Sequence, residues 1–559
     1  MSKIILSGVT KSWGRFCAVD NLDLIIDDNA FVTLLGPSGC GKTTVLRMIA
    51  GLETPTEGRI TIGDQIVFDD KLGINVPANK RKVGFLFQNY ALWPNMTVYE
   101  NIAFGLRNIR ELMPKVDIEA KNAARLSEIL RNPGKVREIL EECLDANGKI
   151  DERKASISLI DAYSISSFTA KKLLGYHLEH GNDVSVEASY FQGKADAAHK
   201  RQEEAGLCLN DQFEVVKDGE VVMEVRKLTK EEIDLKVRQV SRTVKISMYM
   251  DRYPSELSGG QQQRVAIART LAPEPDVLFM DEPLSNLDAK LRLEMRYELQ
   301  RLHVETGSTF VYVTHDQMEA MTLATKIFLM NNGVLQQYAA PMESYNAPSN
   351  LFAADFVGNP SINFIEAKRL ELMHECSEPI AQNIEGIMQL DSVLTLEIFN
   401  GRKVKFRPKE SFDFAAWFMK RDYEEKAHAE KLKTGSSEKG FAEKSNKDES
   451  FRYHISKVDD DYSPQQEQVI TNDDFVLGIR PEHIVVGKAG VLDGEIYGSM
   501  PTGMEVTYKV GIDGYLLTGV VFGSTMLTIG DHEQISFSGE NIMLFDRKSG
   551  KRICVGALE

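Results

Sequence analysis

A glycine-rich run near the N-terminus has the residue types and spacing of a phosphate-binding loop. It follows the apolar stretch 31–35 and precedes the helical pattern 45–50, so the expected order is strand, loop, helix. Its residues are Gly36, Pro37, Ser38, Gly39, Cys40, Gly41, Lys42, Thr43 and Thr44. In such a loop the backbone N–H groups surround polyphosphate oxygens, Lys42 reaches the terminal phosphates and the Thr43 hydroxyl binds Mg²⁺. The loop therefore predicts binding of a nucleoside triphosphate.

The second element that can contact a phosphate lies far downstream, in residues 257–261. It directly precedes the helical pattern 262–271, so Ser258 stands where a helix N-cap would. A serine hydroxyl and glycine N–H groups at a helix N-terminus form an anion site, and a serine that only caps its helix is the simpler alternative. The residues of this site are Ser258, Gly259, Gly260 and Gln261. Because Leu-Ser-Gly-Gly-Gln is the signature of ATP-binding-cassette (ABC) ATPases, the chain resembles that family.

Two adjacent carboxylates follow the apolar strand pattern 277–280. The resemblance implies that Asp281 helps to hold Mg²⁺ and that Glu282 is the base that polarises the attacking water. Gln88 resembles the family glutamine that touches Mg²⁺ and this water and follows the membrane partner. His315, at the end of another apolar run, resembles the histidine that senses the γ-phosphate. Surface charge is the alternative for the carboxylates, and a structural role is the alternative for the histidine.

An aromatic residue and a short loop complete the resemblance. Trp13 precedes the phosphate loop and matches the aromatic that stacks on adenine, with burial in the core as the alternative. Residues 285–288 match the loop that crosses between subunits. In the family the phosphate loop of one copy faces the signature of another, and this sequence has one of each. The resemblance therefore implies a homodimer, or a heterodimer with a close relative, in which ATP is bound between the copies.

Composition and charge restrict the function classes. With 559 residues and 43% hydrophobic content the chain can hold two or three domains with ordinary cores. A net charge of −16 opposes a general nucleic-acid role. No apolar stretch approaches the ~20 residues needed to span a bilayer, so a transport pathway is expected in other subunits. The six scattered cysteines favour a reducing cytosol, and Cys40 is either a thiolate favoured by a helix N-terminus or a small residue that fits.

Several segments are similar to the carbohydrate-importer branch of the family. They are 285–292, 350–358 and 478–483. The branch implies uptake of a sugar or sugar derivative and a peripheral position at the cytoplasmic face of the cell membrane. It also implies two permease subunits that dock near residues 88–96, and indirectly an extracytoplasmic solute-binding protein. Large apolar groups in 89–102 could receive a short permease helix, with ordinary packing as the alternative.

Two other functions stay open. The same ATPase mechanism drives import of polyamines, iron or sulfate, and only the carbohydrate-like tail argues against such a cargo. A non-transport cassette protein acting on ribosomes or DNA is the more distant alternative. Such proteins usually carry paired cassettes or a long coiled coil, and neither occurs in this sequence.

The expected fold is α/β, in two domains. Residues 1–358 are expected to form a phosphate-loop ABC ATPase domain with a helical subdomain, and 359–559 a β-rich regulatory domain similar to an oligonucleotide/oligosaccharide-binding (OB) fold. Turn signals in the second domain are Asn400-Gly401, Asp493-Gly494 and Asp513-Gly514. Its charged stretch, about 412–470, is expected to be a solvated or disordered excursion.

The main departure from the family is an insertion in the helical subdomain at residues 107–226. A helical stripe at 136–144 and a hairpin at 213–225 predict a folded module with helices and strands. A structureless loop of this length would be unusual. Residues 145–151 faintly resemble a calcium loop but lack its ligand spacing, so a turn is favoured. The module is a candidate contact for a permease, a regulator or the other half of the complex.

Overall fold

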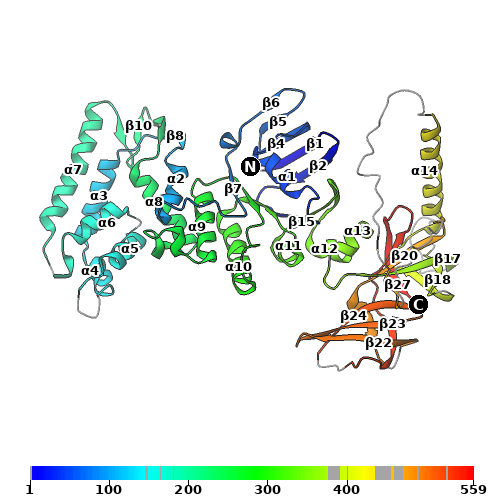
Figure 1. Ribbon diagram of the computed structural model, residues 1–559. Coiled ribbons are helices and arrows are strands. Elements are labelled where there is room, and N and C mark those ends of the chain that lie inside the picture. Colours follow the sequence, from blue (N-terminus) through cyan, green and yellow to red (C-terminus); the bar gives the residue numbers. More distant parts are fainter. Residues whose placement is uncertain are drawn as a thin grey trace, which may run out of the picture. The chain divides into compact units, whose positions relative to one another are not determined.

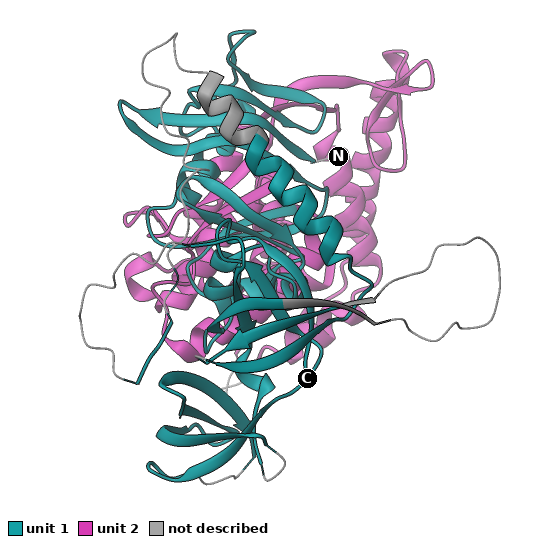
Figure 2. Ribbon diagram, turned by 90° about the vertical axis from the view of Figure 1, so that its right-hand side faces the viewer, with its two compact units in different colours: residues 1–81, 309–559 teal, residues 82–308 magenta. Residues whose placement is uncertain are grey.

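A computed structural model gives the arrangement of the chain (Figure 1). It describes residues 3–144, 149–163, 165–180, 182–375, 391–399, 401–434, 453, 455–458, 470–487, 490–523 and 527–559. The chain forms two compact units, coloured separately in Figure 2. Unit 1 comprises Met1–Arg81 and Thr309–Glu559, and unit 2 comprises Lys82–Ser308. Packing thus divides the chain differently from the expected domains 1–358 and 359–559, which stay a prediction.

The first part of unit 1 holds an antiparallel sheet and a largely parallel one. The antiparallel sheet has the order β2-β1-β4-β5-β6. Its strands are β1 (Ile4–Trp13), β2 (Phe16–Ile26), β4 (Glu57–Ile62), β5 (Gln65–Asp69) and β6 (Ile74–Asn75), and the short helix η1 (Ala78–Lys80) follows. In the other sheet, β14 and β15 flank β3 in parallel and β16 joins β15 antiparallel, with β3 (Phe31–Leu35), β14 (Thr309–Val313), β15 (Lys326–Asn331) and β16 (Val334–Ala339). Every residue of β3 and β14 is buried, as is typical of parallel strands covered on both faces.

The C-terminal part of unit 1 is built from β-strands, as the turn-rich sequence predicts. A closed barrel consists of β17 (Asn363–Glu375), β18 (Asp391–Ile398), β19 (Arg402–Pro408), β27 (Arg552–Leu558), β26 (Ile542–Asp546) and β20 (Asp474–Ile479). A five-stranded sheet consists of β21 (Ile484–Val486), β25 (His532–Phe537), β22 (Leu492–Pro501), β23 (Glu505–Ile512) and β24 (Tyr515–Phe522). The short helix η6 (Pro481–His483) connects β20 to β21. One apolar core runs through barrel and sheet, from Phe406 and Phe475 to Val510 and Ile535. The structure here agrees with an OB-like regulatory domain.

The three turn signals of this region have different outcomes. Asp513-Gly514 forms the turn between β23 and β24, as predicted. The prediction at Asp493-Gly494 is wrong, because both residues lie within β22 and pair with β25. A side chain on Gly494 would meet Val510 Cγ2 at 2.5 Å, so close packing across the sheet requires this glycine rather than a turn. Asn400 lies outside the described residues.

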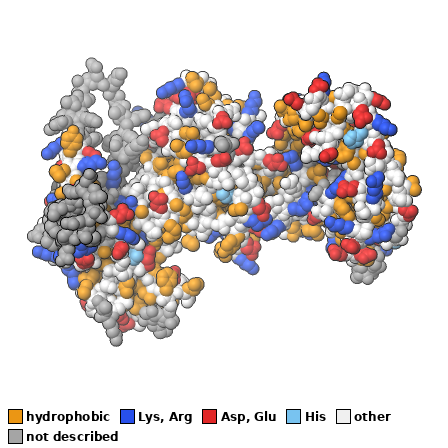
Figure 3. All heavy atoms as spheres, turned by 180° about the vertical axis from the view of Figure 1, so that it is seen from behind, with side chains coloured by type: hydrophobic (Ala, Val, Ile, Leu, Met, Phe, Trp, Pro, Cys, Tyr) orange, Lys and Arg blue, Asp and Glu red, His pale blue; other side chains and the backbone are white. Residues whose placement is uncertain are grey.

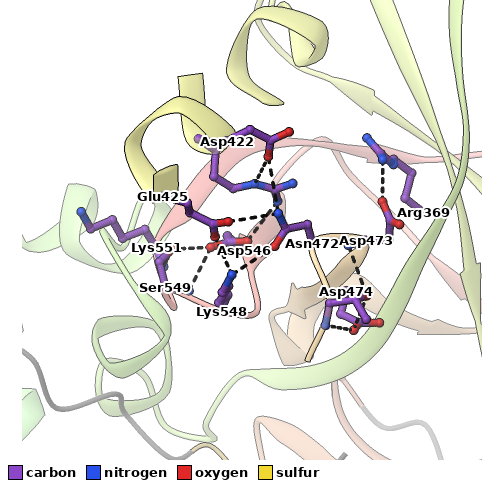
Figure 4. A network of polar contacts seen from close by, with 12 residues as sticks. Arg369, Asp422, Glu425, Asn472, Asp473, Asp474, Asp546, Lys548, Ser549 and Lys551 are labelled. Atoms are coloured by element: carbon purple, nitrogen blue, oxygen red, sulfur yellow. Dashed lines mark hydrogen bonds and ion pairs between the residues drawn. The ribbon is translucent and has the colours of Figure 1, made fainter. Parts of the chain in front are cut away.

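The charged stretch from about residue 412 begins with a helix, α14 (Phe414–Thr434), and not with an excursion. Phe414 and Phe418 are buried in the barrel core, which anchors the first turns despite the charged sequence. Figure 4 shows the polar contacts at the same junction, where Lys548 and Asn472 each donate to Glu425, at 2.7 and 3.1 Å. The Lys548 ammonium lowers the pKa of the Glu425 carboxyl. Residues 435–452 lie outside the described residues, so the expectation is not tested there.

Arg480 joins the barrel to the helices that precede it, α12 (Pro341–Asn346) and α13 (Leu351–Phe356). The side chain is 1% exposed and donates to the carbonyl oxygens of Ala354, Val357 and Tyr345 at 3.0, 2.5 and 2.7 Å. Its guanidinium lies 4.1 Å from the Tyr345 ring centroid. Burial lowers the pKa of Arg480 to about 10. The segment 478–483, which the sequence marks by its resemblance, therefore contains a structural joint.

Replacing Arg480 by Met is expected to lower the free energy of unfolding by about 2–4 kcal/mol, because three buried carbonyl oxygens lose a charged donor. Guanidinium chloride titration of the full chain measures this. The matched control is Arg402→Met, which removes an exposed pair with Asp513 and is expected to cost less than about 1 kcal/mol. Equal losses for the two variants would contradict the structural role of Arg480.

Unit 2 combines two parallel strands with a set of helices. The strands β7 (Val83–Leu86) and β13 (Val277–Asp281) pair in parallel, and all of β13 is buried. The helices outside the insertion are α2 (Val98–Leu106), α8 (Lys230–Thr243), α9 (Gly259–Leu271) and α10 (Ala289–Thr306), with the short η3 (Ser247–Tyr249) and η4 (Pro254–Glu256). Both α2 and α8 begin with a capping box, at Thr97–Glu100 and Thr229–Glu232, as their sequences favour.

The insertion is a folded module, which Figure 1 shows around α3 and α7. The module has its own core of buried apolar side chains. Its helices are α3 (Ile118–Arg131), α4 (Gly134–Glu141), α5 (Glu152–Tyr163), α6 (Ser167–Leu174), η2 (Leu178–His180) and α7 (Ser185–Glu204). Its strands are β8 (Arg110–Pro114), β9 (Cys208–Leu209), β10 (Val215–Lys217), β11 (Glu220–Val221) and β12 (Met223–Lys227). The predicted hairpin is present as β10 and β11, whereas β12 pairs with β8 and closes the base of the module. Residues 145–148 of the calcium-like stretch lie outside the described residues.

Polar contacts fix the module to α8 and the segment that follows it. Ser166 Oγ donates to Glu231 at 2.9 Å, and the Ser167 N–H donates to Asp234 at 2.5 Å. Arg153 donates to the Met248 carbonyl at 3.0 Å. These partners belong to the helices that lead toward the signature, so the module is part of the same compact unit.

Candidate functional site

The phosphate loop lies in unit 1, between β3 and α1 (Lys42–Ala50), where the sequence predicts it. Gly36 and Gly41 have φ angles of 154° and 105°. A side chain at Gly36 would approach the Met330 carbonyl oxygen to 2.2 Å, and one at Gly41 the Ala18 carbonyl oxygen to 2.4 Å. Both positions therefore require glycine, and the loop follows the backbone path of a strand, a tight anion-binding turn and a helix.

Lys42 is 6% exposed, and its ammonium lies on the loop itself. It donates to the carbonyl oxygens of Gly36 and Pro37 at 2.8 and 2.7 Å. The cation is thereby held where the loop N–H groups would collect phosphate oxygens. The neighbouring Cys40 is buried, and burial raises the pKa of its thiol. This contradicts the thiolate interpretation of Cys40 and favours a small residue that fits the loop.

Two further predicted residues, Trp13 and His315, also lie in unit 1. Trp13 ends β1 and is 48% exposed, so it is not a core tryptophan. Its ring stacks on Phe16 with centroids 6.5 Å apart, and a ligand ring could stack on it. His315 is exposed and stands between β14 and Asp316, which caps α11 (Gln317–Leu323).

The hydrogen bonds that hold the turn at His315 were not identified from the sequence. Glu319 is 3% exposed and accepts hydrogen bonds from the Tyr312 and Thr314 hydroxyls, both at 2.7 Å. The contacts fix the turn that presents His315. The four-residue spacing between His315 and Glu319 on a helix start is the only signal that could have indicated this support.

Unit 2 brings Gln88 and Glu282 together, although they lie 194 positions apart in the chain. Gln88 Nε2 donates to Glu282 Oε2 at 3.3 Å and lies 3.4 Å from Ser285 Oγ. Glu282 has a φ angle of 46°, an uncommon backbone conformation for a residue with a side chain, and follows the buried Asp281 at the end of β13. Asn286 Nδ2 donates to the Gln88 carbonyl at 3.0 Å, so the loop 285–288 also holds the glutamine segment.

The signature residues form the start of α9. Ser258 is the N-cap, and its N–H donates to Gln261 Oε1 at 3.0 Å. The helix start is exposed at Ser258 and Gly259, so its N–H groups are open to a ligand. A side chain at Gly260 would meet Leu291 of α10 at 2.7 Å, which explains a glycine at this position.

The residues after Gln88 divide between surface and core. Trp93 is 46% exposed and Phe104 38% exposed, with ring centroids 5.5 Å apart. Tyr90 and Ile102 are buried, which is the ordinary packing that the sequence left open. Arg269 of α9 donates to the Tyr90 and Ala91 carbonyls at 2.8 and 2.6 Å. The segment that leads to Trp93 is thus hydrogen-bonded to the helix that carries the signature.

Charged side chains, helix length and oxygen donors bear on the remaining predictions. On the face drawn in Figure 3, basic and acidic side chains are interspersed, without a continuous basic stripe among the coloured residues. Within the described ranges no helix is long and apolar enough to cross a membrane. The candidate metal residues Thr43, Gln88 and Asp281 offer hydroxyl, amide and carboxylate oxygens, the donor types that suit Mg²⁺.

Comparisons with known proteins agree on one family, the ABC transporters. A family model described as "ABC transporter" matches residues 19–159 and 169–285. The trehalose/maltose import ATP-binding protein MalK of Thermococcus litoralis is 36% identical over 367 residues, 66% of this chain and 67% of that protein. The xylose/arabinose import ATP-binding protein XacJ of Haloferax volcanii is 37% identical, over 66% of this chain and 65% of that protein. The spermidine/putrescine import ATP-binding protein PotA of Onion yellows phytoplasma is 37% identical, over 64% and 74%. The chain thus spans about two thirds of the length of the sugar-import relatives.

Proposed function

Because the chain belongs to the ABC transporter family and is an ABC-type ATPase, we propose that it hydrolyses ATP to drive import of a sugar or sugar derivative. The observation that carries this proposal is the contact of Gln88 with Glu282 at 3.3 Å. In this contact Gln88, the residue proposed to follow the membrane partner, lies next to Glu282, the residue proposed to activate water. The sugar-import relatives MalK and XacJ support the cargo class.

The proposed chemistry uses few groups. Mg²⁺ would be held by Thr43, Gln88 and Asp281 and would neutralise charge on the phosphates. Lys42 stabilises negative charge that develops on the transferred phosphoryl group, and the loop N–H groups orient it. Glu282 accepts a proton from the attacking water. The remaining groups, His315 and Trp13, would contact the γ-phosphate and the adenine.

A complete site would need two copies of the chain, or this chain and a close relative. Ser258 and the N–H groups of Gly259 and Gly260 would bind the γ-phosphate held by the loop of the opposing copy. Nucleotide binding then joins the copies and hydrolysis separates them. The exposed Trp93 and Phe104 form the surface on which a permease helix would dock, close to the Gln88 segment. We therefore propose a position at the cytoplasmic face of the membrane, with a solute-binding protein as an indirect partner.

Polyamine import is the second candidate, favoured by the 37% identity with PotA. The test is uptake and ATPase stimulation in the complex that copurifies with this chain, reconstituted in vesicles. A panel of labelled mono- and disaccharides and sugar phosphates is compared with spermidine, and Lys42→Ala serves as the inactive control. We expect a carbohydrate to stimulate hydrolysis severalfold and to accumulate. Stimulation by spermidine alone, or copurification with ribosomes instead of permeases, would contradict the proposal.

A further inference from the structure

A buried lysine lies beside the exposed aromatic residue at the end of β1. Lys11 is 8% exposed, and its ammonium lies over the Trp13 ring, 5.0 Å from the ring centroid. A cation within about 6 Å of an indole centroid is attracted by the negative potential of the ring face. Trp13 itself is still 48% exposed, so part of the ring is open to a ligand. The ATPase chemistry proposed above assigns no role to Lys11.

Two acceptors from the segment after α1 hold this ammonium in place. Lys11 Nζ lies 2.6 Å from Glu53 Oε1 and donates to the Thr54 carbonyl oxygen at 2.7 Å. An ammonium has three N–H donors, so these two contacts leave one for the π system of the ring. Burying the charge is costly unless it is paired, and the Glu53 carboxylate supplies the pair. The ion pair, the carbonyl and the ring together fix the side chain of Lys11.

The segment that holds Lys11 is joined to the helix that follows the phosphate loop. The Glu53 N–H donates to the Arg47 carbonyl oxygen of α1 at 3.2 Å. Lys42, which is proposed to contact the terminal phosphates, is the first residue of this same helix. A helix of nine residues and one ion pair therefore connect the phosphate contact at Lys42 with the ring of Trp13.

The end of β1 also lies against the phosphate loop through its neighbour β2. The pairing of the two strands changes register between Lys11 and Ser12, which leaves Ala18 as a bulge in β2. A bulge changes the direction in which nearby side chains point. The Ala18 carbonyl oxygen lies so close to Gly41 of the loop that an added Cβ there would approach it to 2.4 Å. The strand end that carries Trp13 thus adjoins the phosphate loop.

We propose that Lys11 is a positioning residue for the nucleotide base, which fixes the Trp13 ring as the surface on which adenine stacks. The inference rests on the adenine contact of Trp13 in the proposed function. A side chain that is free to change its rotamer must be ordered when a ligand stacks on it, and this ordering opposes binding. Lys11 orders the ring before ATP binds. Its ammonium contacts the ring and not the base, so Lys11 acts through Trp13.

The fold does not depend on this lysine alone, so its role can be tested by substitution. The Thr56 N–H donates to the Thr10 carbonyl oxygen at 2.8 Å, and the Ser12 N–H donates to Thr56 Oγ1 at 3.1 Å. These contacts join β1 to the segment after α1 without Lys11. Loss of the lysine charge is therefore expected to free the Trp13 ring while the two segments stay together.

Steady-state ATP hydrolysis by the full-length chain tests the proposal. Lys11→Met keeps an unbranched apolar side chain and removes the charge, and we expect the KM for ATP to rise about three- to tenfold, as for the loss of one cation–π contact. The kcat should change by less than about twofold, because Lys42 and Glu282 are untouched. Inorganic tripolyphosphate, which has phosphates but no base, should inhibit the variant and the unaltered chain with the same inhibition constant.

A second substitution tests whether Lys11 acts through the ring. Trp13→Ala should raise the KM for ATP at least as much as Lys11→Met does. In the double variant, Lys11→Met should add less than about twofold, because the ring that it orders is absent. Lys11→Arg keeps a cation that can pair with Glu53 and lie over the indole, so its KM should stay within about twofold of the unaltered chain.

The matched control is Lys326→Met, which removes the same two kinds of contact elsewhere in unit 1. Lys326 pairs with Asp27 at 3.1 Å and lies 5.1 Å from the Tyr338 ring centroid. It begins β15, at the end of the strand that is remote from the phosphate loop. This variant should hydrolyse ATP with the KM of the unaltered chain. Thermal melting verifies that each variant is folded.

The possible results separate Lys11 from the adenine contact on which its role rests. An unchanged KM in folded Lys11→Met, with a raised KM in Trp13→Ala, would overturn the role of Lys11 alone. An unchanged KM in Trp13→Ala would overturn this role together with the proposed adenine contact. Additive effects in the double variant, or an equal weakening of tripolyphosphate inhibition by Lys11→Met, would show that Lys11 does not act through the ring and would also overturn the proposal.

Discussion

Glu282→Gln is expected to lower steady-state ATP hydrolysis by about 10²–10⁴-fold, the usual contribution of a general base. The amide keeps the shape of the side chain and its contact with Gln88, but it cannot accept a proton from water. ATP affinity should change little, because the loop and Lys42 are untouched. The variant is therefore expected to accumulate as an ATP-bound dimer, measured by phosphate release and by size-exclusion chromatography with light scattering.

The matched control for this variant is Glu294→Gln, which makes the same chemical change at an exposed position of α10. It should hydrolyse ATP at the rate of the unaltered chain. Turnover by Glu282→Gln within tenfold of the unaltered chain would show that another group activates the water.

Ser258→Arg is expected to abolish hydrolysis to a similar extent for a different reason. Ser258 is exposed at the start of α9, so a long cationic side chain there projects into the surface that would close on the other copy. Loss of the N-cap costs only about 0.5–2 kcal/mol, and the fold should survive. The variant should bind ATP through its own loop but remain monomeric with ATP.

The control for bulk and charge is Ser189→Arg, at an exposed position of α7 in the inserted module. It should leave both hydrolysis and ATP-dependent dimerisation unchanged. If Ser258→Arg dimerises with ATP as the unaltered chain does, the signature is not part of the closing surface.

The nucleotide motifs are predictable from sequence because each is a short run with local structural demands. Gly36 and Gly41 occupy positions where any side chain would collide with a carbonyl oxygen, and Ser258 caps the helix that its own sequence starts. The capping boxes at Thr97 and Thr229 are local in the same sense. The backbone conformation and the helix caps at these positions depend on residues that are close to them in the sequence.

The predictions that are wrong concern positions whose structure depends on residues that are distant in the sequence. Gly494 resembles a turn residue, yet Val510 and Ile535 from neighbouring strands make it a packing glycine. The charged helix α14 persists because Phe414 and Phe418 reach the barrel core. Cys40 sits at a helix N-terminus, but burial governs the pKa of its thiol.

The packing of the inserted module against α8 likewise cannot be predicted from local sequence patterns. The contact of Ser167 with Asp234 joins segments 67 residues apart, and the pairing of β8 with β12 closes a module of more than a hundred residues. No periodicity in α5 or α6 indicates that their outer faces meet α8. Such contacts follow from tertiary packing, and local sequence patterns do not predict them.

Mixing Lys42→Ala with Ser258→Arg tests most directly whether ATP is hydrolysed between two copies. Each variant alone should be inactive, but a mixed dimer contains one intact site, formed by the loop of one copy and the signature of the other. An equimolar mixture that exchanges freely should recover up to about a quarter of the sites of the unaltered chain. Phosphate release by the mixture well above the sum of the separate variants is the predicted result. A mixture that forms mixed dimers but stays as inactive as its components would contradict the shared site.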